Sequence, residues 1–370
     1  MWIWQQANWP DFYWQEEVIN PLLKYARLNQ GMLLGKMGLV DNAHQAFSLD
    51  TLLANIVHSS AIEGEKLNPF SMRSSLAKKL GVVLKEQHKT TNQTEGLANI
   101  LWDAVNHWQE PLSLVRILDW HSQLFVPGYT ILNPIQGGVL RSDEPMMVVS
   151  GRIDKPKVHF EAPPRDGLEQ RLEQFVTWFN QSQHDPLLDP FVRAGIAHLW
   201  FVTLHPLEDG NGRITRLLTD LALAQCEHQS IRFYAMSVSI AENRNAYYDI
   251  LEQSQRGNLD ITPWLEWFLT MFDDAIGQSL KTIDLTLEKG LFWQRVNQSS
   301  FQNQLSKEQV KVLNRLLDGE FSEGIGASQY QKVVKVSRAT ATRHLAQLVE
   351  NNCLQKTGAG GRSTRYVVAK

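Results

Sequence analysis

Apolar residues recur at helical spacing along most of the chain, and this pattern predicts a mainly α protein. One face of residues 49–62 is apolar, and residues 190–204 are apolar around most of the helix, which is typical of a buried element. Further helices are predicted over 68–110 with a polar break at 85–94, and over 112–125, 167–180, 243–257, 263–272 and 285–304, the last a linker helix and loop. Residues 145–162 alternate as strand, turn and strand, and so predict a β-hairpin.

The C-terminal region has its own pattern of three short helices followed by a hairpin. The helices are predicted over 307–317, 327–334 and 338–351, with Ser337 as the N-cap of the third. Strands over 354–357 and 364–368 flank a glycine-rich tip that runs from Gly358 to Gly361. This order is that of a winged helix, whose third helix would enter the major groove of DNA.

The composition is that of a globular chain of 370 residues, 43% hydrophobic and 20% charged, with a formal net charge of −3. This length allows two or three domains with sizeable cores. The sequence has no apolar run of about eighteen residues that would predict a membrane span, and its start lacks the pattern of a signal peptide. Cys226 and Cys353 show no pairing pattern, so we expect reduced thiols and a cytoplasmic protein without a membrane partner.

Charge is unevenly spread along the chain. Residues 305–370 hold eleven Lys and Arg against five Asp and Glu, a net charge of +6, and the remainder carries −9. Such asymmetry indicates a separate module with its own partner, and a basic surface suits the phosphates of duplex DNA. Candidate DNA contacts on the third helix and the wing are Arg338, Thr340, Thr342, Arg343, Arg362 and Arg365. A protein-docking winged helix, whose basic residues serve solubility, is the alternative.

Residues 205–216 read HPLEDGNGRITR and combine a titratable base, carboxylates, a Gly-Asn-Gly turn and two arginines. The residues that follow continue at helical spacing, so the turn leads into a helix N-terminus, whose unpaired N–H groups bind anions. Arg213 and Arg216 fall in the first turn, where the helix dipole disfavours each cation by roughly 0.3–1 kcal/mol. Two cations at this end of a helix indicate that an anion, most often a phosphate, lies between them.

The other side chains of this segment suit phosphate chemistry. His205 titrates near neutral pH and can act as a general base. Asp209 is a hard oxygen ligand that suits Mg²⁺, whereas Glu208 is expected to point away. Asn211 can donate hydrogen bonds to phosphate oxygens. Together these residues predict a site for transfer of a phosphate-linked group, with a base on one side and a metal on the other.

The same segment resembles the motif of the Fic family, H-x-F-x-[D/E]-G-N-G-R-x-x-R, at every fixed position but one. Leu207 stands where the family usually has Phe, a buried anchor, so we expect weaker packing there. Fic proteins carry a β-hairpin flap before the motif, often opened by a Gly-x-x-Arg like Gly138 to Arg141, and the hairpin at 145–162 fits it. The resemblance implies that the outer edge of the flap holds a target segment by β-augmentation. A hairpin without this role is the alternative.

A shorter Fic pattern, [S/T]-x-x-x-E-[G/N], is present at Ser59, Glu63 and Gly64. The helix stops here with Gly64 in the usual C′ position, which leaves Glu63 at the negative end of the dipole. In the family this glutamate reaches the second arginine of the main motif, here Arg216, so that two unfavourable charges satisfy each other. The resemblance therefore implies an inhibitory helix over 49–64, and a solvated surface glutamate is the alternative.

The resemblance implies a protein adenylyltransferase, which moves AMP from ATP to a Tyr, Thr or Ser hydroxyl of a target protein with the help of Mg²⁺. His205 would be the catalytic base and Asp209 the metal ligand. The implied nucleotide-binding residues are Glu63, Val158, His159, Phe160, Asp209, Gly210, Asn211, Gly212, Arg213, Arg216, Tyr247 and Gln255, of which Tyr247 and Gln255 would touch the nucleoside. The alternatives are removal of AMP with Glu63 positioning a water, transfer of another phosphate-linked group, and a DNA-binding regulator whose Fic domain senses nucleotide.

The resemblance also divides the chain into three parts. These are an N-terminal helical region over 1–105 with the inhibitory helix at 49–64, a Fic-type helical core with a small β-hairpin flap over 106–285, and a winged helix-turn-helix over 305–370. Residues 1–47 are rich in Trp and Tyr, which predicts an aromatic cluster that packs a small domain together. The target protein, the operator and the oligomeric state, a homodimer included, are left open.

Overall fold

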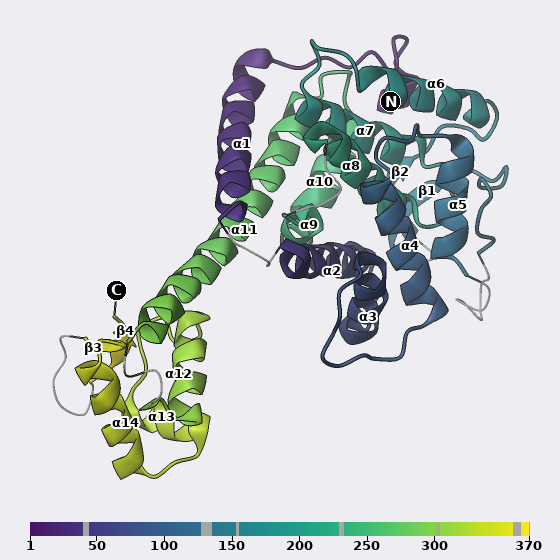
Figure 1. Ribbon diagram of the computed structural model, residues 1–370. Helices are drawn as coiled ribbons and strands as arrows, with labels where there is room; N and C mark the ends of the chain where they lie inside the picture. The colour runs from purple at the N-terminus through teal and green to yellow at the C-terminus, as the bar shows by residue number, and fades with distance from the viewer. Residues whose placement is uncertain are drawn as a thin grey trace. The chain divides into compact units, whose positions relative to one another are not determined.

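The computed structural model of the chain describes residues 1–39, 44–126, 135–152, 155–228, 233–299, 301, 304–357 and 364–369. Within them lie 14 α-helices and two antiparallel sheets of two strands each, so the predicted mainly α fold is confirmed (Figure 1). By its internal contacts the chain divides into two units, one of Met1–Gly35 and Asp41–Ser279, the other of Lys36–Val40 and Leu280–Lys370. In the parts that the structure describes, each helix is too short or too polar to cross a membrane.

The first unit is built almost wholly of helices. In chain order its elements are the 3-10 turn η1 (Ile3–Gln5), α1 (Glu16–Met37), α2 (His44–Ile62), α3 (Pro69–Leu80), α4 (Asn92–Asn106), α5 (Leu114–Leu124), β1 (Met147–Arg152), β2 (Lys155–Glu161), α6 (Leu168–Ser182), α7 (Pro190–Leu204), α8 (Asn211–Glu227), α9 (Met236–Glu242) and α10 (Arg244–Gln255). Helix α11 (Thr262–Asn297) begins in this unit and ends in the second. Helix α7 has the bounds that the apolar pattern predicts.

Helices α7 and α8 pack along each other at the centre of the first unit (Figure 1). Helix α7 begins where Asp189 accepts a hydrogen bond from the N–H of Phe191, with a proline at its first position. Every residue of α7 from Phe191 to Leu204 is buried, and so is every residue of α8 from Ile214 to Gln225. The loop between the two helices is therefore held at both ends by the core.

Strands β1 and β2 form the predicted hairpin. Val148 pairs with Phe160, after which the register shifts so that Val149 pairs with Val158. Such a bulge bends a strand and increases its twist. Because the sheet consists of β1 and β2 alone, the other edge of β1 has no strand beside it within the described residues.

The second unit contains three helices and a hairpin of its own. Its elements after α11 are α12 (Lys307–Leu317), α13 (Ala327–Val334), α14 (Arg338–Glu350), β3 (Leu354–Lys356) and β4 (Tyr366–Val368). The bounds predicted for the first two helices are confirmed, and Ser337 caps α14 by accepting a hydrogen bond from the N–H of Thr340. Tyr330 and Leu345 lie in the buried core of this unit. The glycine-rich tip of the hairpin, with Arg362, lies outside the described residues.

Helix α11 is continuous, so the prediction of two separate segments over 263–272 and 285–304 is wrong. The apolar pattern breaks where polar side chains occupy the helix. In the structure Asp273 accepts a hydrogen bond from Asn29, and Asp284 pairs with Lys36, so polar positions of α11 meet polar groups of α1. A pattern of apolar residues does not detect such pairs, and it also predicts no helix where α1 lies.

Two helical glycines give a matched pair of substitutions. A Cβ at Gly96 of α4 would lie 2.2 Å from the backbone oxygen of Gln123. We expect Gly96→Ala to lower the free energy of unfolding by about 1–3 kcal/mol despite its gain in helix propensity. A Cβ at Gly277 of α11 would meet nothing within 4 Å in the described chain, so Gly277→Ala should raise the same free energy by up to about 1 kcal/mol. Urea unfolding followed by circular dichroism measures both, and an unchanged Gly96→Ala protein would contradict the close packing of α4 on α5.

Candidate functional site

The loop between α7 and α8 begins with a backbone reversal at its first residue. His205 ends α7 with φ 45° and ψ 55°, a left-handed conformation that is uncommon for residues other than glycine. Its N–H still donates to the carbonyl of Phe201 at 3.2 Å. Two residues later Leu207 is fully buried, so the position where the Fic motif has Phe is a buried anchor here as well. The strained residue is thus held by the helix on one side and by this anchor on the other.

Asn211 closes the loop from the inside. Its Oδ1 accepts a hydrogen bond from the N–H of Leu207 at 2.9 Å, and its Nδ2 donates to the carbonyl of Leu207 at 2.7 Å. The amide oxygen and one of the two amide N–H groups are therefore engaged with Leu207. That Asn211 also donates to phosphate oxygens stays a prediction. Its backbone N–H, the first of α8, is a further donor for an anion.

A buried arginine from the segment before the hairpin holds the same loop. Arg141 donates from Nε to the carbonyl of His205 at 2.9 Å and from Nη2 to the carbonyl of Pro163 at 2.5 Å. Its backbone N–H donates to the carbonyl of Pro206 at 3.0 Å. The sequence indicates Arg141 only as the opening of a flap, because its partners are backbone carbonyls that a pattern of side chains does not reveal.

One ring nitrogen of His205 is able to accept a proton. Its Nδ1 lies 3.1 Å from the carbonyl of Val202, which can only accept, so Nδ1 carries the proton and Nε2 of the neutral ring is an acceptor. Burial lowers the pKa of His205, with a further contribution from Arg141, and outweighs the opposing effects of the Val202 hydrogen bond and of nearby carboxylates. The ring is therefore neutral at pH 7, with Nε2 ready to take a proton.

Two glycines allow other groups to approach the start of α8 closely. Gly210 has φ 80°, and a Cβ there would lie 2.8 Å from Leu124 and 2.9 Å from Phe125. A Cβ at Gly212 would lie 2.1 Å from Oε1 of Glu63. The carboxylate of Glu63 thus lies directly against the helix N-terminus, where free N–H groups and the positive end of the dipole favour an anion.

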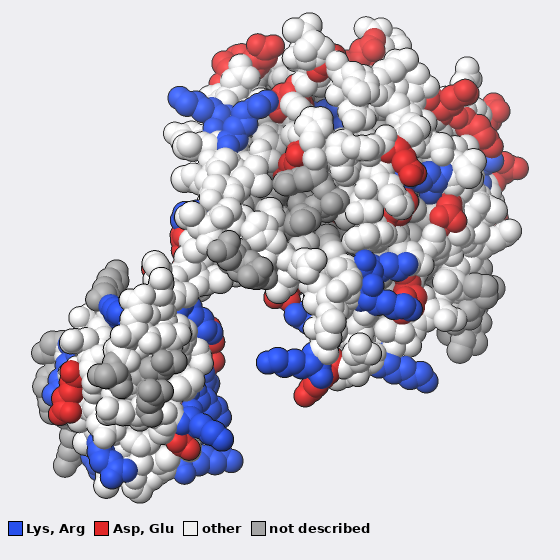
Figure 2. All heavy atoms as spheres, viewed as in Figure 1, with Lys and Arg blue, Asp and Glu red and all other residues white. Residues whose placement is uncertain are grey.

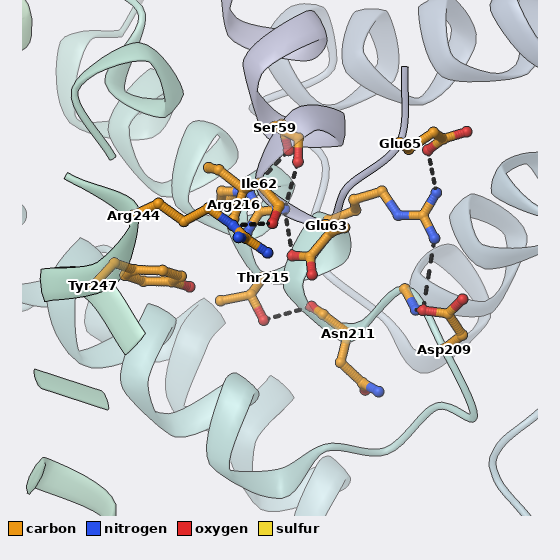
Figure 3. Close-up of polar contacts among 12 residues, drawn as sticks. Ser59, Ile62, Glu63, Glu65, Asp209, Asn211, Thr215, Arg216, Arg244 and Tyr247 are labelled. Atoms are coloured by element: carbon orange, nitrogen blue, oxygen red, sulfur yellow. Dashed lines mark hydrogen bonds and ion pairs between the residues drawn. The ribbon is translucent and has the colours of Figure 1, made fainter. Parts of the chain in front are cut away.

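Glu63 projects from the end of α2 toward Arg216 of α8, and Figure 3 shows the contact. Nη2 of Arg216 lies 2.8 Å from Oε1 of Glu63 and 2.8 Å from the carbonyl of Ser59, and Nε lies 2.9 Å from the hydroxyl of Ser59. The Arg216 side chain is 3% exposed and that of Glu63 29%. Nη1 of Arg216 is buried and has no hydrogen-bond partner among the residues described. The predicted pairing of Glu63 with Arg216 is therefore present, and it leaves one guanidinium nitrogen unused.

The charge state of Glu63 follows from this pairing. Burial alone would raise the pKa of Glu63, but Arg216 and a hydrogen bond from Tyr248 help to hold the pKa below its usual value. The carboxylate is therefore ionised at neutral pH. Arg244 and Tyr248 of α10 also donate to the carbonyl of Ile62, at 2.6 and 3.3 Å, and so satisfy the end of α2.

A second carboxylate meets the other arginine of the motif. Nη1 of Arg213 lies 2.7 Å from Oε2 of Glu65, and its Nη2 lies 3.7 Å from Oδ1 of Asp209 (Figure 3). The same guanidinium lies over the ring of Phe125, 5.0 Å from its centre. The motifs give no sign of Glu65, although its place two residues after Glu63 puts it on the same segment.

A cavity of about 480 Å³, a size that suits a nucleotide, opens beside these groups. Its lining includes the candidate base and most of the predicted nucleotide site: Glu63, His159, Phe160, His205, Asp209, Gly210, Asn211, Gly212, Tyr247 and Gln255. Arg213, Arg216 and Val158 are not part of this lining. Glu208 also lines the cavity, and the expectation that its side chain points away stays a prediction.

A buried chain of hydrogen bonds runs from this cavity into the core. The hydroxyl of Tyr247 lies 2.9 Å from Nε2 of His198, and Nδ1 of His198 lies 3.0 Å from the hydroxyl of Thr219. Thr219 donates its proton to the carbonyl of Thr215, so His198 donates from Nδ1 and accepts from Tyr247. Burial lowers the pKa of His198 to about 3, which keeps the ring neutral. The sequence pattern gives no sign of His198, because this residue lies within an otherwise apolar helix.

Asp209 is the candidate metal ligand beside this cavity. Its side chain is 53% exposed and lines the cavity, and its Oδ1 accepts a hydrogen bond from the N–H of Gly210 at 2.5 Å, which orients the carboxylate. Mg²⁺ is commonly held by one or two carboxylates together with phosphate oxygens of a substrate. A single aspartate beside an anion site is compatible with this kind of binding.

The residues predicted to contact DNA differ in their exposure and in their hydrogen bonds. Arg338, Thr342 and Arg343 are exposed on α14. The hydroxyl of Thr340 lies 2.9 Å from that of the capping Ser337. Nη1 of Arg365 donates to the carbonyl of Gly324 and to the side chain of Gln329, at 3.1 and 3.0 Å, so this guanidinium is engaged within the unit. The remaining residue, Arg362, lies outside the described part of the chain.

Known proteins are similar to this chain in sequence and in fold. Residues 111–223 match the model of the Fic/DOC family, and residues 2–82 match that of a domain of unknown function (DUF4172). Protein adenylyltransferase Fic of Drosophila virilis is 26% identical over 278 residues, which are 74% of this chain and 52% of that protein. The protein of the same name from Drosophila yakuba is 29% identical over 238 residues, 63% of this chain and 41% of that protein. The chain thus spans about half the length, or less, of these curated relatives.

A solved structure supports the fold. The crystal structure of a Fic family protein from Desulfovibrio desulfuricans G20 aligns with a TM-score of 0.55 at 19% identity, covering 96% of this chain and 97% of that one. At this identity the likeness bears on the fold alone. Residues 111–223, which match the Fic/DOC family model, contain His205, the Gly-Asn-Gly turn and both arginines.

Proposed function

We propose that the chain is a protein adenylyltransferase, which moves AMP from ATP to a Tyr, Thr or Ser hydroxyl of a target protein. The observation that carries the proposal is that a neutral His205, with Nδ1 protonated, and the N-terminus of α8 border one cavity. A base beside an anion site is what transfer of a phosphate-linked group to a hydroxyl requires. The names of the curated relatives favour AMP as the group transferred.

The reaction exchanges one phosphorus–oxygen bond for another. The proton of the acceptor hydroxyl passes to Nε2 of His205 while its oxygen bonds to the α-phosphorus of ATP. The bond from that phosphorus to the oxygen bridging the β-phosphate breaks, and pyrophosphate leaves. The N–H groups around Gly212 and the dipole of α8 stabilise charge on the phosphate oxygens. Mg²⁺ held by Asp209 would neutralise further phosphate charge when bound.

The hairpin borders the acceptor side of the cavity. Val149 and Ser150 of β1 and Phe160 of β2 line it, and the ring centre of Phe160 lies 6.5 Å from that of His205. The outer edge of β1 is unpaired in the described chain, and Val149 is 51% exposed. An extended segment of the target would add to this edge by β-augmentation and present its hydroxyl to His205.

Glu63 is proposed to keep the resting enzyme slow. Its carboxylate lies against Gly212 and pairs with Arg216, so a triphosphate extended along the start of α8 must displace it. A nucleotide that binds without this displacement leaves the α-phosphate out of line with the acceptor. Misplacement of this kind costs about two orders of magnitude in rate or more.

Removal of AMP by the same residues is the second candidate reaction. Glu63 lines the cavity together with His205 and carries a negative charge, so it could position a water for attack on the same phosphorus. Release of AMP from a modified protein separates this reaction from transfer. Labelling with nucleotides other than ATP separates AMP transfer from transfer of another phosphate-linked group.

Binding of duplex DNA is proposed for the second unit, as a winged helix. Residues 324–349 include Lys332, Lys335, Arg338 and Arg343 and contain no Asp or Glu. Helices α13 and α14 lie within this stretch and are separated by three residues, as in a helix-turn-helix. Lys and Arg side chains outnumber Asp and Glu on the face of this unit that Figure 2 shows. Phosphates of DNA complement such a face.

The exposed side of α14 carries small side chains, which a helix needs in order to enter the major groove of DNA. Between its two arginines and beyond them lie Ala339, Thr342 and Ala346, all exposed and small enough to let the helix approach base edges closely. Two of the acidic residues of this unit are in ion pairs outside this stretch, Asp318 with Lys289 and Glu320 with Arg315. These features favour DNA over a protein partner.

His205→Ala should abolish AMP transfer, because a positioned general base typically contributes about 10²–10⁴-fold. Incorporation of α-labelled ATP into the proteins of a cell lysate measures this, with circular dichroism as the control for folding. Since the pKa of His205 lies below its usual value of 6.5, the base stays unprotonated as the pH falls to that value. The acid limb of the pH–rate profile should therefore lie below pH 6.5. Near-normal labelling by the variant would refute the mechanism.

Glu63→Gly should raise labelling by about tenfold or more, because it removes the carboxylate that holds Arg216 and lies against Gly212. Glu86→Gly, at an exposed loop position, is the matched control and should leave the rate unchanged. The same Glu63→Gly protein should lose any activity that releases AMP. Labelling at or below the native level, with nucleotide binding intact, would show that Glu63 is not an inhibitor.

Arg338→Gln with Arg343→Gln should weaken DNA binding by the full chain about tenfold or more, and lower the slope of log K against log salt by about 1–2. Fluorescence anisotropy with a mixed-sequence duplex at several salt concentrations measures both quantities. Lys78→Gln with Lys79→Gln removes equal charge from α3 of the first unit and should change neither. Failure of the native chain to bind at low salt, or an unchanged double variant, would leave the protein-docking alternative.

A further inference from the structure

The first residues of the chain contact the flap. Nε1 of Trp4 donates to the carbonyl of Glu161 at 2.8 Å, and Nε1 of Trp2 donates to its Oε2 at 3.3 Å. Glu161 is the last residue of β2, so both indoles meet the strand that carries Phe160. Ile3, between the two tryptophans, is fully buried and fixes the backbone from which they project.

The ring of Trp2 contacts Phe160, and the ring of Phe160 in turn lies near the candidate base His205. The Trp2 ring packs edge-to-face on Phe160 with ring centres 5.4 Å apart, and the guanidinium of Arg256 lies 5.0 Å from the centre of Trp2. Arg256 in turn donates to the carbonyl of Val158 in β2 at 2.7 Å. Phe160 is 2% exposed, and the next ring beyond it is His205, at 6.5 Å. A shift of Trp2 would therefore reach the base through a single buried ring.

The same segment is anchored at its other end. Trp9 packs edge-to-face on Trp200 of α7, with ring centres 6.3 Å apart, and α7 is the helix that ends at the candidate base. The N–H of Tyr13 donates to the carbonyl of Leu259, in the loop before α11, at 3.0 Å. Residues 2–13 thus run from β2 to the core of the first unit, with contacts at both ends.

We infer that residues 2–13 form a strap that sets the position of the flap, and that Trp2 and Trp4 are positioning residues for the acceptor hydroxyl. They act through Phe160 and the end of β2, and the inference rests on the proposed function, in which the flap presents the acceptor. The contacts of the strap described above are with the flap, α7, Arg256 at the end of α10 and the loop before α11, whereas the proposed phosphate site is at the start of α8. The strap therefore governs presentation of the acceptor far more than affinity for nucleotide. It gives a role to the beginning of the region that matches a domain of unknown function.

Hydrogen–deuterium exchange tests the strap independently of activity. In the Trp2→Ala, Trp4→Ala double variant of the full chain, amides of 147–152 and 155–161 should exchange about tenfold faster, while those of α7 and α8 keep their native rates. Trp108→Ala is the control: this tryptophan is also half-buried, and its edge-to-face contact is with His228. It should leave the flap unchanged. Native exchange in the flap of the double variant, or equal acceleration in α7 and α8, would overturn the inference.

Kinetics separates positioning from general support of the fold. In a Glu63→Gly background, Trp2→Ala with Trp4→Ala should lower the labelling rate at saturating ATP about tenfold and leave the KM for ATP within about twofold. Trp2→Phe with Trp4→Phe keeps the aromatic contacts and loses only the two N–H donors, so it should restore most of the rate. A rise in the KM for ATP with an unchanged rate at saturation would overturn the inference. Absence of labelling in every variant would instead refute the proposed function, and the exchange experiment would still decide whether the strap exists.

Discussion

The guanidinium of Arg216 is a charge buried in the core, and much of the site follows from the need to match it. Removing a cation from water costs several kcal/mol unless hydrogen bonds and an opposite charge replace its hydration. Ser59 supplies a hydroxyl and a carbonyl, and Glu63 supplies a carboxylate, all from the end of α2. The end of α2 therefore cannot leave α8 unless another anion replaces the carboxylate.

The proposed inhibition by Glu63 would then be an exchange of anions at one buried cation. A phosphate that reached Arg216 would replace the carboxylate and could also use Nη1, the nitrogen without a partner among the described residues. A ligand with less negative charge than the displaced carboxylate of Glu63 would leave the positive charge of Arg216 incompletely neutralised. The lowered pKa of Glu63 is another consequence of this pairing, because Arg216 favours the charged form of the carboxyl. On the proposed mechanism, the contact that holds α2 in place would also select the charge of the nucleotide that replaces it.

Features that depend on local sequence were predictable. The bounds of α7, α12 and α13 follow from apolar spacing, and the place of His205 beside the Gly-Asn-Gly turn follows from neighbouring residues in the sequence. Such features need no knowledge of which distant segments meet. The contact of Glu63 with Arg216 joins distant segments, and it was predicted only because the resemblance to the Fic motifs implies it.

Features that depend on inward-facing polar groups were not predictable. The motif suggests that Asn211 reaches outward to phosphate, and it gives no sign that the amide also satisfies the backbone of Leu207 inside the loop. His198 lies in an apolar helix, and its partners are on α8 and α10. Arg141 acts on backbone carbonyls, which no side-chain pattern reveals. In each case a buried polar group must find a partner, and the partner is determined by the tertiary fold.

The two sides of the cavity are held by contacts of different strength. The start of α8 emerges from two helices whose residues are almost all buried, so the phosphate side is rigid and preformed. The flap is a two-stranded hairpin, marginal on its own in water, and depends on half-buried groups such as Trp2, Trp4 and the His159–Glu252 pair at 2.5 Å. The proposed regulation by Glu63 would act on the rigid side, where the carboxylate lies against Gly212. The proposed presentation of the acceptor would depend on the softer side, where small changes in surface contacts can shift the hairpin without disturbing the core.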